Sequence, residues 1–367
     1  MANILVSGYY GFNNAGDEAI LAGLIRAIRE LEPETNFTVI SGTAARTRAE
    51  HGVSAVSRGD FKKIWKAMAE ADLVISGGGS LLQDVTSTKS LVYYLGVMTL
   101  AMMRHRPVMV YAQGIGPVTG LVGRTLIPTV VNGVSQITVR DQESLETLRH
   151  LGVFHPPAMV TADPALALGP ADPDWGAALL KEQGVDLARP ILGVSIRPWK
   201  LGEQPVEPEL AKALDELAGE GLQVVFIPMQ LPRDIQAATE VARLMTQPAE
   251  ILQGDYTYAH AHAMIARCDA MIGMRYHALV FAAMDGIPLA GLSYDPKTDS
   301  WLKLVGETPA GTTNNLTGRA LARAVRRALA EAPAFRQRLL HKMAELTPLA
   351  KKNAELAVNL IKRSGHK

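Results

Sequence analysis

Short runs of β-branched and aliphatic residues alternate with longer segments of helical periodicity along most of the chain. This alternation is typical of βαβ units, in which crossover helices join parallel strands. In the first half it predicts strands at residues 4–7, 37–41, 73–76, 108–112, 137–139 and 159–161. In the second half it predicts strands at residues 191–196, 224–228, 270–273 and 289–293. The sequence therefore predicts an α/β protein with two doubly wound, Rossmann-like sheets.

The chain is long enough for two domains. Its 367 residues accommodate two units of about 150 to 200 residues, each able to bury its own core. Residues 163–175 contain three prolines and no sustained period, which indicates a hinge. We therefore place an N-terminal domain at residues 1–168 and a C-terminal domain at residues 169–345.

The last part of the chain reads as helical from Thr317 onward, with breaks expected at Pro333 and Pro348. We expect residues 346–367 to form a C-terminal helix that packs back on the N-terminal domain. Two doubly wound domains with such a helix indicate a GT-B-like architecture, in which the domains face a cleft. Ligands of open parallel sheets bind beyond the carboxyl ends of the strands, so residues directly after strands are candidates for a site.

Charge and cysteine content exclude several classes of protein. The 37 Lys and Arg residues nearly balance the 36 Asp and Glu residues, without a block of one sign. A nucleic-acid binder needs a concentrated basic face, so neither DNA nor RNA is an expected partner. Cys268 is the only cysteine, which excludes an internal disulfide or a cysteine-based zinc cluster and fits a reducing cytoplasm.

Two further segments bear on localisation. The opening residues MANILVSG run straight into a predicted strand without the features of a secretory signal, so we expect a cytoplasmic protein. The stretch Leu91–Met103 is the most apolar, but it is shorter than the ~20 residues that cross a bilayer. A buried helix is favoured there over a contact with a membrane surface.

The first candidate loop is GYYGFNNAGDEA, at residues 8–19, which joins the opening strand to a helix. Its glycines let backbone amides approach a ligand, and the helix N-terminus favours an anion. The spacing matches neither a dinucleotide fingerprint nor a P-loop. The candidate contacts for ligand hydroxyls are Asn13, Asn14, Gly16 and Asp17. Helix capping explains Asp17 and Glu18 equally well.

Two more glycine-rich loops follow predicted buried strands, SGGGSLLQD at residues 76–84 and AQGIGPV at residues 112–118. Three successive glycines form a backbone nest, although sharp turns from strand to helix need glycine in any case. Together with the first loop they line one sheet edge with room for a long polar ligand. The candidate contacts are Gly78, Gly79, Ser80, Gln113 and Gly114.

A basic set follows other strands. Arg140 ends one strand, Arg275 and His277 follow another in GMRYHALVFAA, and Tyr294 and Lys297 follow the next in GLSYDPKT. We expect these strand ends to lie together. Two arginines and a lysine suit a small anion that carries a carboxylate and a phosphate. A histidine among them can give or take a proton near neutral pH.

Each of these residues also has a plain structural explanation. An arginine before an aspartate, as in Arg140-Asp141, is often a surface ion pair, and a lone histidine at a helix start is often structural. As a set at three strand ends they favour a binding site. His260 and His262 have no carboxylate at ligand spacing, so a helix-start role is favoured and no metal is expected.

The motifs occur in an order that closely resembles the polysaccharide pyruvyl transferases, especially the bacterial enzymes tied to the anchoring of cell-surface proteins. Six motifs in register span nearly the whole chain: GYYGFNNAGDEA, SGGGSLLQD, AQGIGP, VRD, GMRYHA and LSYDPKT. The resemblance implies a GT-B-like fold and phosphoenolpyruvate as co-substrate, without a further cofactor. It also implies a 4,6-linked pyruvyl ketal on N-acetylmannosamine of a lipid-linked secondary cell-wall polymer precursor.

The same resemblance assigns residues. Arg140, His277 and Lys297 match the arginine, histidine and lysine of the family's phosphoenolpyruvate site, and Arg275 matches by motif. On this basis His277 is the candidate acid, Arg140 and Lys297 hold the donor's negative charges, and Asp17 is a candidate base.

A lipid-linked acceptor further implies peripheral contact with the inner face of the cell membrane. Arg104, Arg106 and Arg124 are candidate contacts for anionic headgroups, with solvated surface charge as the alternative. Two rival functions remain open at this point. One is a glycosyltransferase of the same fold that takes a nucleotide sugar, and the other is a catalytically silent glycan-binding protein.

Overall fold

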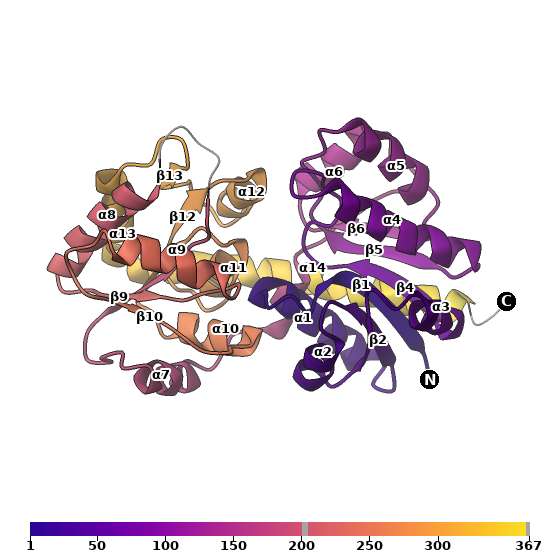
Figure 1. The fold of residues 1–367 in the computed structure, drawn as a ribbon, viewed down its shortest axis with the longest axis horizontal. Helices are drawn as coiled ribbons and strands as arrows, with labels where there is room; N and C mark the ends of the chain where they lie inside the picture. Colours follow the sequence, from indigo (N-terminus) through magenta and orange to yellow (C-terminus); the bar gives the residue numbers. More distant parts are fainter. Residues whose placement is uncertain (200–204, 365–367) are drawn as a thin grey trace. The chain divides into compact units, whose positions relative to one another are not determined.

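The computed structural model describes residues 1–199 and 205–364 (Figure 1). The chain divides into two compact units. The first comprises Met1–Phe12, Asp17–Leu168 and Glu345–Lys367, and the second comprises Asn13–Gly16 and Gly169–Ala344. Each unit contains one wholly parallel, doubly wound sheet, so the predicted α/β class is confirmed. Residues 200–204 of the predicted C-terminal domain and residues 365–367 of the predicted terminal helix lie outside the described residues.

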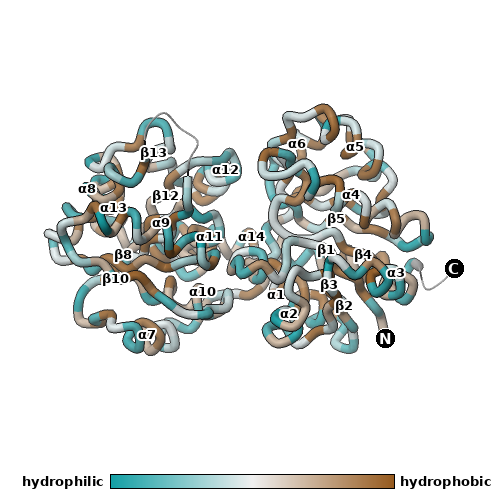
Figure 2. The backbone as a smooth tube through the Cα atoms, viewed as in Figure 1, coloured by the Kyte–Doolittle hydropathy of each residue, from teal (hydrophilic) through white to brown (hydrophobic). Residues whose placement is uncertain are grey.

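The first unit is built on a seven-stranded sheet of order β3-β2-β1-β4-β5-β6-β7. Its strands are β1 (Asn3–Tyr10), β2 (Asn36–Ser41), β3 (Ser54–Ser57), β4 (Leu73–Gly77), β5 (Val108–Gln113), β6 (Gln136–Val139) and β7 (Met159–Val160). Every residue of β4 and β5 is buried, and Figure 2 shows much of β4 as hydrophobic. Strands that helices cover on both faces consist of continuous apolar residues, and this pattern is why the sequence predicted these strands.

Helices cover both faces of this sheet. The helices are α1 (Ala15–Leu31), α2 (Ala44–His51), α3 (Phe61–Glu70), α4 (Thr88–Met103), α5 (Leu121–Val131) and α6 (Gln142–His150), with the end of α14 (Ala332–Ser364). One core joins α1 and α14, and a second core joins α3, α4, α5 and α6. The apolar stretch predicted to be a buried helix forms α4, with Leu91, Leu95 and Met98 inside the second core.

The second unit is built on a six-stranded sheet of order β10-β9-β8-β11-β12-β13. Its strands are β8 (Ile191–Ser195), β9 (Gln223–Phe226), β10 (Ala249–Ile251), β11 (Ala270–Gly273), β12 (Leu289–Ser293) and β13 (Gly311–Thr312). Its helices are α7 (Pro173–Glu182), α8 (Glu207–Gly219), α9 (Arg233–Ala242), α10 (Tyr258–Ala266), α11 (Tyr276–Met284), α12 (Pro296–Leu304) and α13 (Gly318–Ala330).

The two units divide between Leu168 and Gly169, within the segment predicted as a hinge. This segment contains secondary structure, because Pro164–Leu168 form a 3-10 helix and α7 begins at Pro173, where proline fits the first turn of a helix. The break predicted at Pro348 was wrong. Pro348 lies inside α14 rather than ending it. An internal proline costs a helix about 3 kcal/mol, but the neighbouring Leu346 and Ala350 are buried, and this packing holds the helix together.

The first glycine loop divides between the units. Although it lies within the range predicted for the N-terminal domain, Asn13–Gly16 groups with the second unit. The Ala15 amide donates to the Met229 carbonyl at 2.8 Å, and the Leu231 amide donates to the Asn13 carbonyl at 3.2 Å. These backbone bonds attach the loop beyond the end of β9.

Among the described residues, no helix combines the length and apolar character that a membrane span requires.

Candidate functional site

Arg140 is buried at the carboxyl edge of the first sheet, where β6 ends. Its guanidinium donates to Ser80 Oγ at 3.3 Å and lies 3.4 Å from one carboxylate oxygen of Asp163. A methyl group at Gly114 would lie 2.5 Å from its Nη2 atom, so the guanidinium rests directly on the third glycine loop. The structure excludes the explanation of Arg140 as an exposed surface pair.

Two carboxylates share the charge of Arg140. Asp141 Oδ2 lies 3.4 Å from Arg140 Nε, while Asp141 Oδ1 accepts the Ser144 amide at the start of α6 at 2.7 Å. Asp163 likewise uses Oδ1 to accept the Ala165 amide at 3.1 Å. Each carboxylate thus connects a helix start to the guanidinium, which orients the fork beside the glycine loops.

The second and third glycine loops touch one another in the first unit. The Gly114 amide donates to the Gly79 carbonyl at 3.0 Å. Gly79 has a φ of 54°, and a methyl group there would lie 2.6 Å from Asp17 Oδ1. Gly78 has a φ of 97°, so both glycines adopt backbone that other residues rarely take. Of the predicted contacts, Ser80 and Gly114 therefore lie against Arg140, Gly79 is bonded to Gly114, and Asp17 lies beside Gly79.

Gln113 lies at the end of β5, and its contact with a ligand stays a prediction. Its side chain is fully buried, and Nε2 donates to both the carbonyl and the hydroxyl of Ser76 at 2.9 Å. These bonds join the ends of the neighbouring strands β4 and β5. In the structure Gln113 stabilises the sheet edge on which the loops stand.

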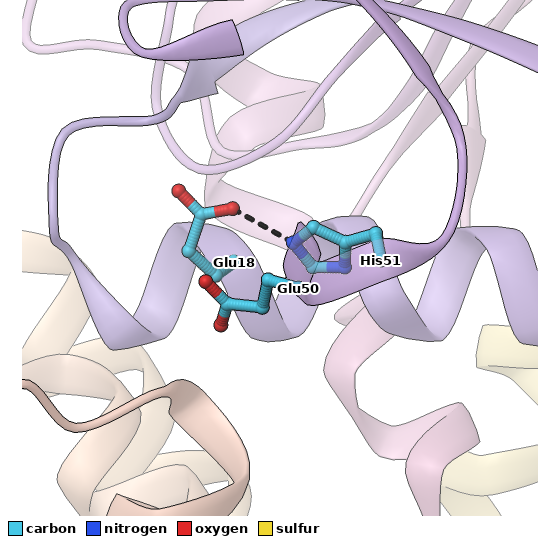
Figure 3. A group of neighbouring side chains, drawn as sticks. All are labelled: Glu18, Glu50 and His51. Atoms are coloured by element: carbon cyan, nitrogen blue, oxygen red, sulfur yellow. Dashed lines mark hydrogen bonds and ion pairs between the residues drawn. The ribbon is translucent and has the colours of Figure 1, made fainter. Parts of the chain in front are cut away.

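Figure 3 shows Glu18, Glu50 and His51. Each residue has one carboxylate oxygen or ring nitrogen that could bind a metal ion, and these three atoms lie within 4.8 Å of one another. Glu18 Oε2 pairs with His51 Nε2 at 2.9 Å, and Glu18 Oε1 accepts the Gly11 amide at 2.7 Å. Glu50 pairs in turn with Arg46 at 3.6 Å. Since the carboxylates have these partners, the cluster explains how the first glycine loop is held, and Glu18 does more than cap α1.

A cationic group lies at the carboxyl edge of the second sheet. Arg197 follows β8, and Tyr294 and Lys297 follow β12, with β11 between these strands. Arg197 Nη1 donates to the Tyr294 hydroxyl at 3.3 Å, and its guanidinium carbon lies 4.9 Å from the ring centroid. Lys297 Nζ lies 5.5 Å from the same centroid. Two cations therefore contact one phenol.

The electrostatics of Tyr294 reflect this arrangement. Burial by itself raises the pKa of the phenol, but the charges of Lys297 and Arg197 oppose it, and the net result is a pKa below the ordinary value. The same field favours any other small anion at this edge. Sequence reasoning missed Arg197, although its place two residues after a buried strand was the signal that selected the other candidates.

His277 lies in the first turn of α11, directly after β11. A methyl group at Gly16 would lie 2.2 Å from His277 Nδ1, so the first glycine loop rests on the imidazole ring. Asn14 Oδ1 accepts the Gly16 amide at 3.1 Å, and Asn13 has a φ of 56°. The structure thus brings Gly16 to His277 within the second unit, with Asn14 bonded to Gly16.

Arg275 has a carboxylate partner in the second unit. Its Nε donates to Asp234 Oδ2 at 3.0 Å, and its Nη2 donates to Asp234 Oδ1 and, at 3.0 Å, to Gln230 Oε1. Asp234 also accepts the Met229 and Gln230 amides. The fork of Arg275 therefore holds the turn to which Asn13–Gly16 is bonded, and its contact with the substrate stays a prediction.

The two histidines of YAHAHAM have structural roles. His260 stands at the third position of α10 and forms a capping box with Thr257, as the predicted helix-start role requires. His262 is buried, pairs with Asp285 at 2.7 Å and stacks on Phe281. Asp285 also accepts the Ala171 amide at 2.8 Å, so it connects α10 to the segment before α7.

The fold and the residues at the strand ends define a class, the GT-B-like proteins with two doubly wound parallel sheets. The structure of S. aureus MnaA with UDP matches with a TM-score of 0.66 and 14% identity, over 99% of this chain and 96% of that chain. Anabaena Alr3699/HepE with UDP matches with a TM-score of 0.65 and 14% identity, over 98% and 99%. The Neisseria meningitidis UDP-GlcNAc 2-epimerase matches with a TM-score of 0.62 and 11% identity, over 99% and 100%. At these identities the likeness concerns the fold alone.

Residues 14–296 match the sequence profile of the polysaccharide pyruvyl transferases. The chain belongs to the polysaccharide pyruvyl transferase family and is a transferase, which confirms the resemblance seen in the motifs. The matched segment includes Arg140, Arg275 and His277 and ends one residue before Lys297. No curated protein sequence gives a significant match.

Proposed function

We propose that this transferase moves the three-carbon unit of phosphoenolpyruvate onto a sugar and closes it as a cyclic ketal, releasing phosphate. The observation that carries the proposal is the cationic edge of the second sheet, where Arg197 and Lys297 contact Tyr294. Phosphoenolpyruvate combines a carboxylate with a phosphate on a small framework. A guanidinium fork and a mobile ammonium are the groups that bind such an anion well.

The proposed acid is His277. It follows β11, which lies between the strands that carry Arg197 and Lys297, so it belongs to the same edge. Gly16, one of the three candidate acceptor contacts, lies against the ring of the proposed proton donor, and Asn13 and Asn14 belong to the same short loop. This proximity supports the assignment of these residues to a reaction between an acceptor hydroxyl and the donor.

The proposed reaction joins two hydroxyls of the sugar to C2 of phosphoenolpyruvate. His277 protonates the methylene carbon of phosphoenolpyruvate, and a sugar hydroxyl attacks the electron-poor C2 as it loses its proton to a base. The C2–O bond to phosphate breaks, the second hydroxyl attacks C2, and its proton leaves with the phosphate. Arg197 and Lys297 stabilise the negative charge that grows on the leaving phosphate. The donor contact of Arg140, which belongs to the first unit, and the base role of Asp17 stay predictions.

For the acceptor we propose N-acetylmannosamine, as a 4,6-ketal, within a lipid-diphosphate-linked polysaccharide precursor at the inner face of the cell membrane. Family membership supports a polysaccharide acceptor, and the glycine loops around Arg140 offer backbone amides and Ser80 for sugar hydroxyls. No cofactor beyond the co-substrate is proposed.

The direct test supplies phosphoenolpyruvate and a synthetic lipid-diphosphate disaccharide and measures phosphate release, with mass analysis of the product. We expect release that depends on both substrates and a product heavier by one pyruvyl ketal. Glycan binding without phosphate release would identify a silent binding protein instead. In a His277→Ala variant we expect phosphoenolpyruvate binding without turnover. Near-normal transfer by that variant would remove His277 from the acid role.

The alternative function is that of a glycosyltransferase that uses a nucleotide sugar. The UDP bound in two of the similar structures supports this alternative. Calorimetry separates the two functions because it titrates the same protein with phosphoenolpyruvate and with a panel of nucleotide sugars. We expect the titration with phosphoenolpyruvate to release heat of binding, and we expect weaker binding of phosphoenolpyruvate in the Arg197→Met and Lys297→Met variants. Saturable binding of a nucleotide sugar without binding of phosphoenolpyruvate would favour the rival.

A further inference from the structure

The helical layer formed by α3, α4 and α5 carries many exposed apolar side chains. These helices share one core beneath them, so their outer sides form one surface of the first unit. Leu121 is 81% exposed, Met103 67% and Phe61 66%. The full set of large exposed apolar residues on this layer is Phe61, Trp65, Val85, Val92, Met103, Leu121 and Val122. We call this set, with the basic residues among it, the α3–α5 surface.

Contacts between the helices make the surface continuous. The Arg104 guanidinium at the end of α4 lies 4.3 Å from the ring centroid of Trp65 on α3. At the other side, the Asp84 carboxylate accepts the Thr119 amide at 2.9 Å and the Gly120 amide at 2.7 Å. This tie holds Val85, before α4, beside Leu121 at the start of α5. Val92 and Met103 are both exposed on α4 between these two ends.

The surface carries an excess of basic residues. Residues 60–131, from the N-cap of α3 to the end of α5, contain seven Lys and Arg residues and four Asp and Glu residues, whereas the whole chain has a net charge of +1. The four acids all have partners: Asp60 pairs with Lys63 at 2.9 Å, Asp72 accepts the Asn3 amide, Asp84 accepts two amides of the loop before α5, and Glu70 lies 3.9 Å from Lys66. Within residues 1–199 and 205–364, Lys89 and Arg124 form no ion pair.

We propose that the α3–α5 surface binds an anionic lipid bilayer. Exposed Phe, Trp, Leu and Met side chains enter the boundary between headgroups and acyl chains, and Lys and Arg among them bind the anionic headgroups. The proposal rests on the proposed function, because a lipid-linked acceptor is presented at a bilayer surface. It also fits the loops, since α4 and α5 each follow one of the glycine loops that contact Arg140.

Vesicle flotation tests the proposal on the full-length protein. We expect it to float with phosphatidylglycerol–phosphatidylcholine vesicles and to stay largely in solution with phosphatidylcholine alone. A Leu121→Glu, Val122→Glu variant removes two apolar anchors without harming the fold, because acidic residues favour the first turn of a helix. This variant should partition about tenfold less onto anionic vesicles. The matched control, Leu244→Glu with Leu349→Glu, replaces exposed leucines elsewhere and should float like the original chain.

Phosphate release with a lipid-free disaccharide acceptor keeps the two proposals apart. If the proposed function holds, the Leu121→Glu, Val122→Glu variant retains this activity on the lipid-free acceptor while its binding to vesicles falls. If the unaltered chain binds vesicles normally but releases no phosphate, the proposed function is overturned and the proposed membrane surface is not. The surface proposal is overturned if the unaltered chain does not float with anionic vesicles. It is also overturned if light scattering shows that the unaltered chain and the control variant are dimers and the Leu121→Glu, Val122→Glu variant is a monomer, since a second copy then covers this surface.

Discussion

A methyl group on Gly16 would lie 2.2 Å from Nδ1 of His277, closer than side chains pack. The two residues are distant in sequence, yet both belong to the second unit. The contact means that the first glycine loop sets where the imidazole of His277 can stand.

A Gly16→Ala substitution should therefore displace His277 and lower the rate of transfer. A displacement of about 1 Å at a catalytic group commonly costs about 100-fold in rate. We expect kcat for phosphate release to fall by that order, with little change in the binding of phosphoenolpyruvate, measured by calorimetry. Gly219→Ala is the matched control because a methyl group there meets nothing within 4 Å. Equal activity of the two variants would show that the loop does not position His277.

The pair of Arg275 and Asp234 should stabilise the second unit more than it serves the donor directly. Removing one member of a buried ion pair typically costs about 3 to 5 kcal/mol because the other charge stays buried. We expect Arg275→Met to lower the free energy of unfolding by that order in chemical denaturation. Asp234→Asn combined with Arg275→Met should cost less than the sum of the two single changes, since the double variant leaves no lone charge. Additive costs would contradict the pairing.

Arg140 should behave as a buried cation shared by two carboxylates. Arg140→Met leaves Asp141 and Asp163 without their cation, so we expect the first unit to lose about 3 kcal/mol or more in a denaturation experiment. Arg140→Lys keeps the charge but loses the fork, and it should be less destabilising. If both variants unfold like the original chain, the guanidinium does not hold the two helix starts. Titration of each folded variant with phosphoenolpyruvate then tests the predicted donor contact separately.

Tyr294 should ionise at a lower pH than an ordinary tyrosine. Burial raises the pKa of its phenol, the charges of Lys297 and Arg197 lower it, and the net shift is downward. The lowered pKa contributes stability that is complete above the ordinary value of about 10 and is lost as the pH falls through the folded value.

The measurement for Tyr294 is the phenolate absorbance of the protein minus that of Tyr294→Phe. We expect Lys297→Met and Arg197→Met each to move this difference titration to higher pH, because each removes a cation beside the ring. A titration that does not move in either variant would mean that the two cations do not act on the phenol.

Local pattern predicted the central strands well, because strands buried on both faces carry apolar runs that are visible without any partner. It missed β3, β10 and β13, which have four, three and two residues. Each of the three is an edge strand of its sheet, and none is fully buried. Strands this short are defined by pairing with a neighbour more than by their own composition, so periodicity carries little signal for them.

The sequence by itself determined the order of the buried strands and their helices, the three glycine loops and the presence of cations directly after strands, since these are properties of neighbouring residues. The tertiary structure alone decided which of those cations have carboxylate partners. Arg275 meets Asp234, Arg140 meets Asp163, and Lys297 lies 3.4 Å from Asp295, while Arg197 and Lys297 both contact the phenol of Tyr294. The physical reason is that such partners are brought together by which strands lie side by side, and sheet order is a property of the whole folded chain.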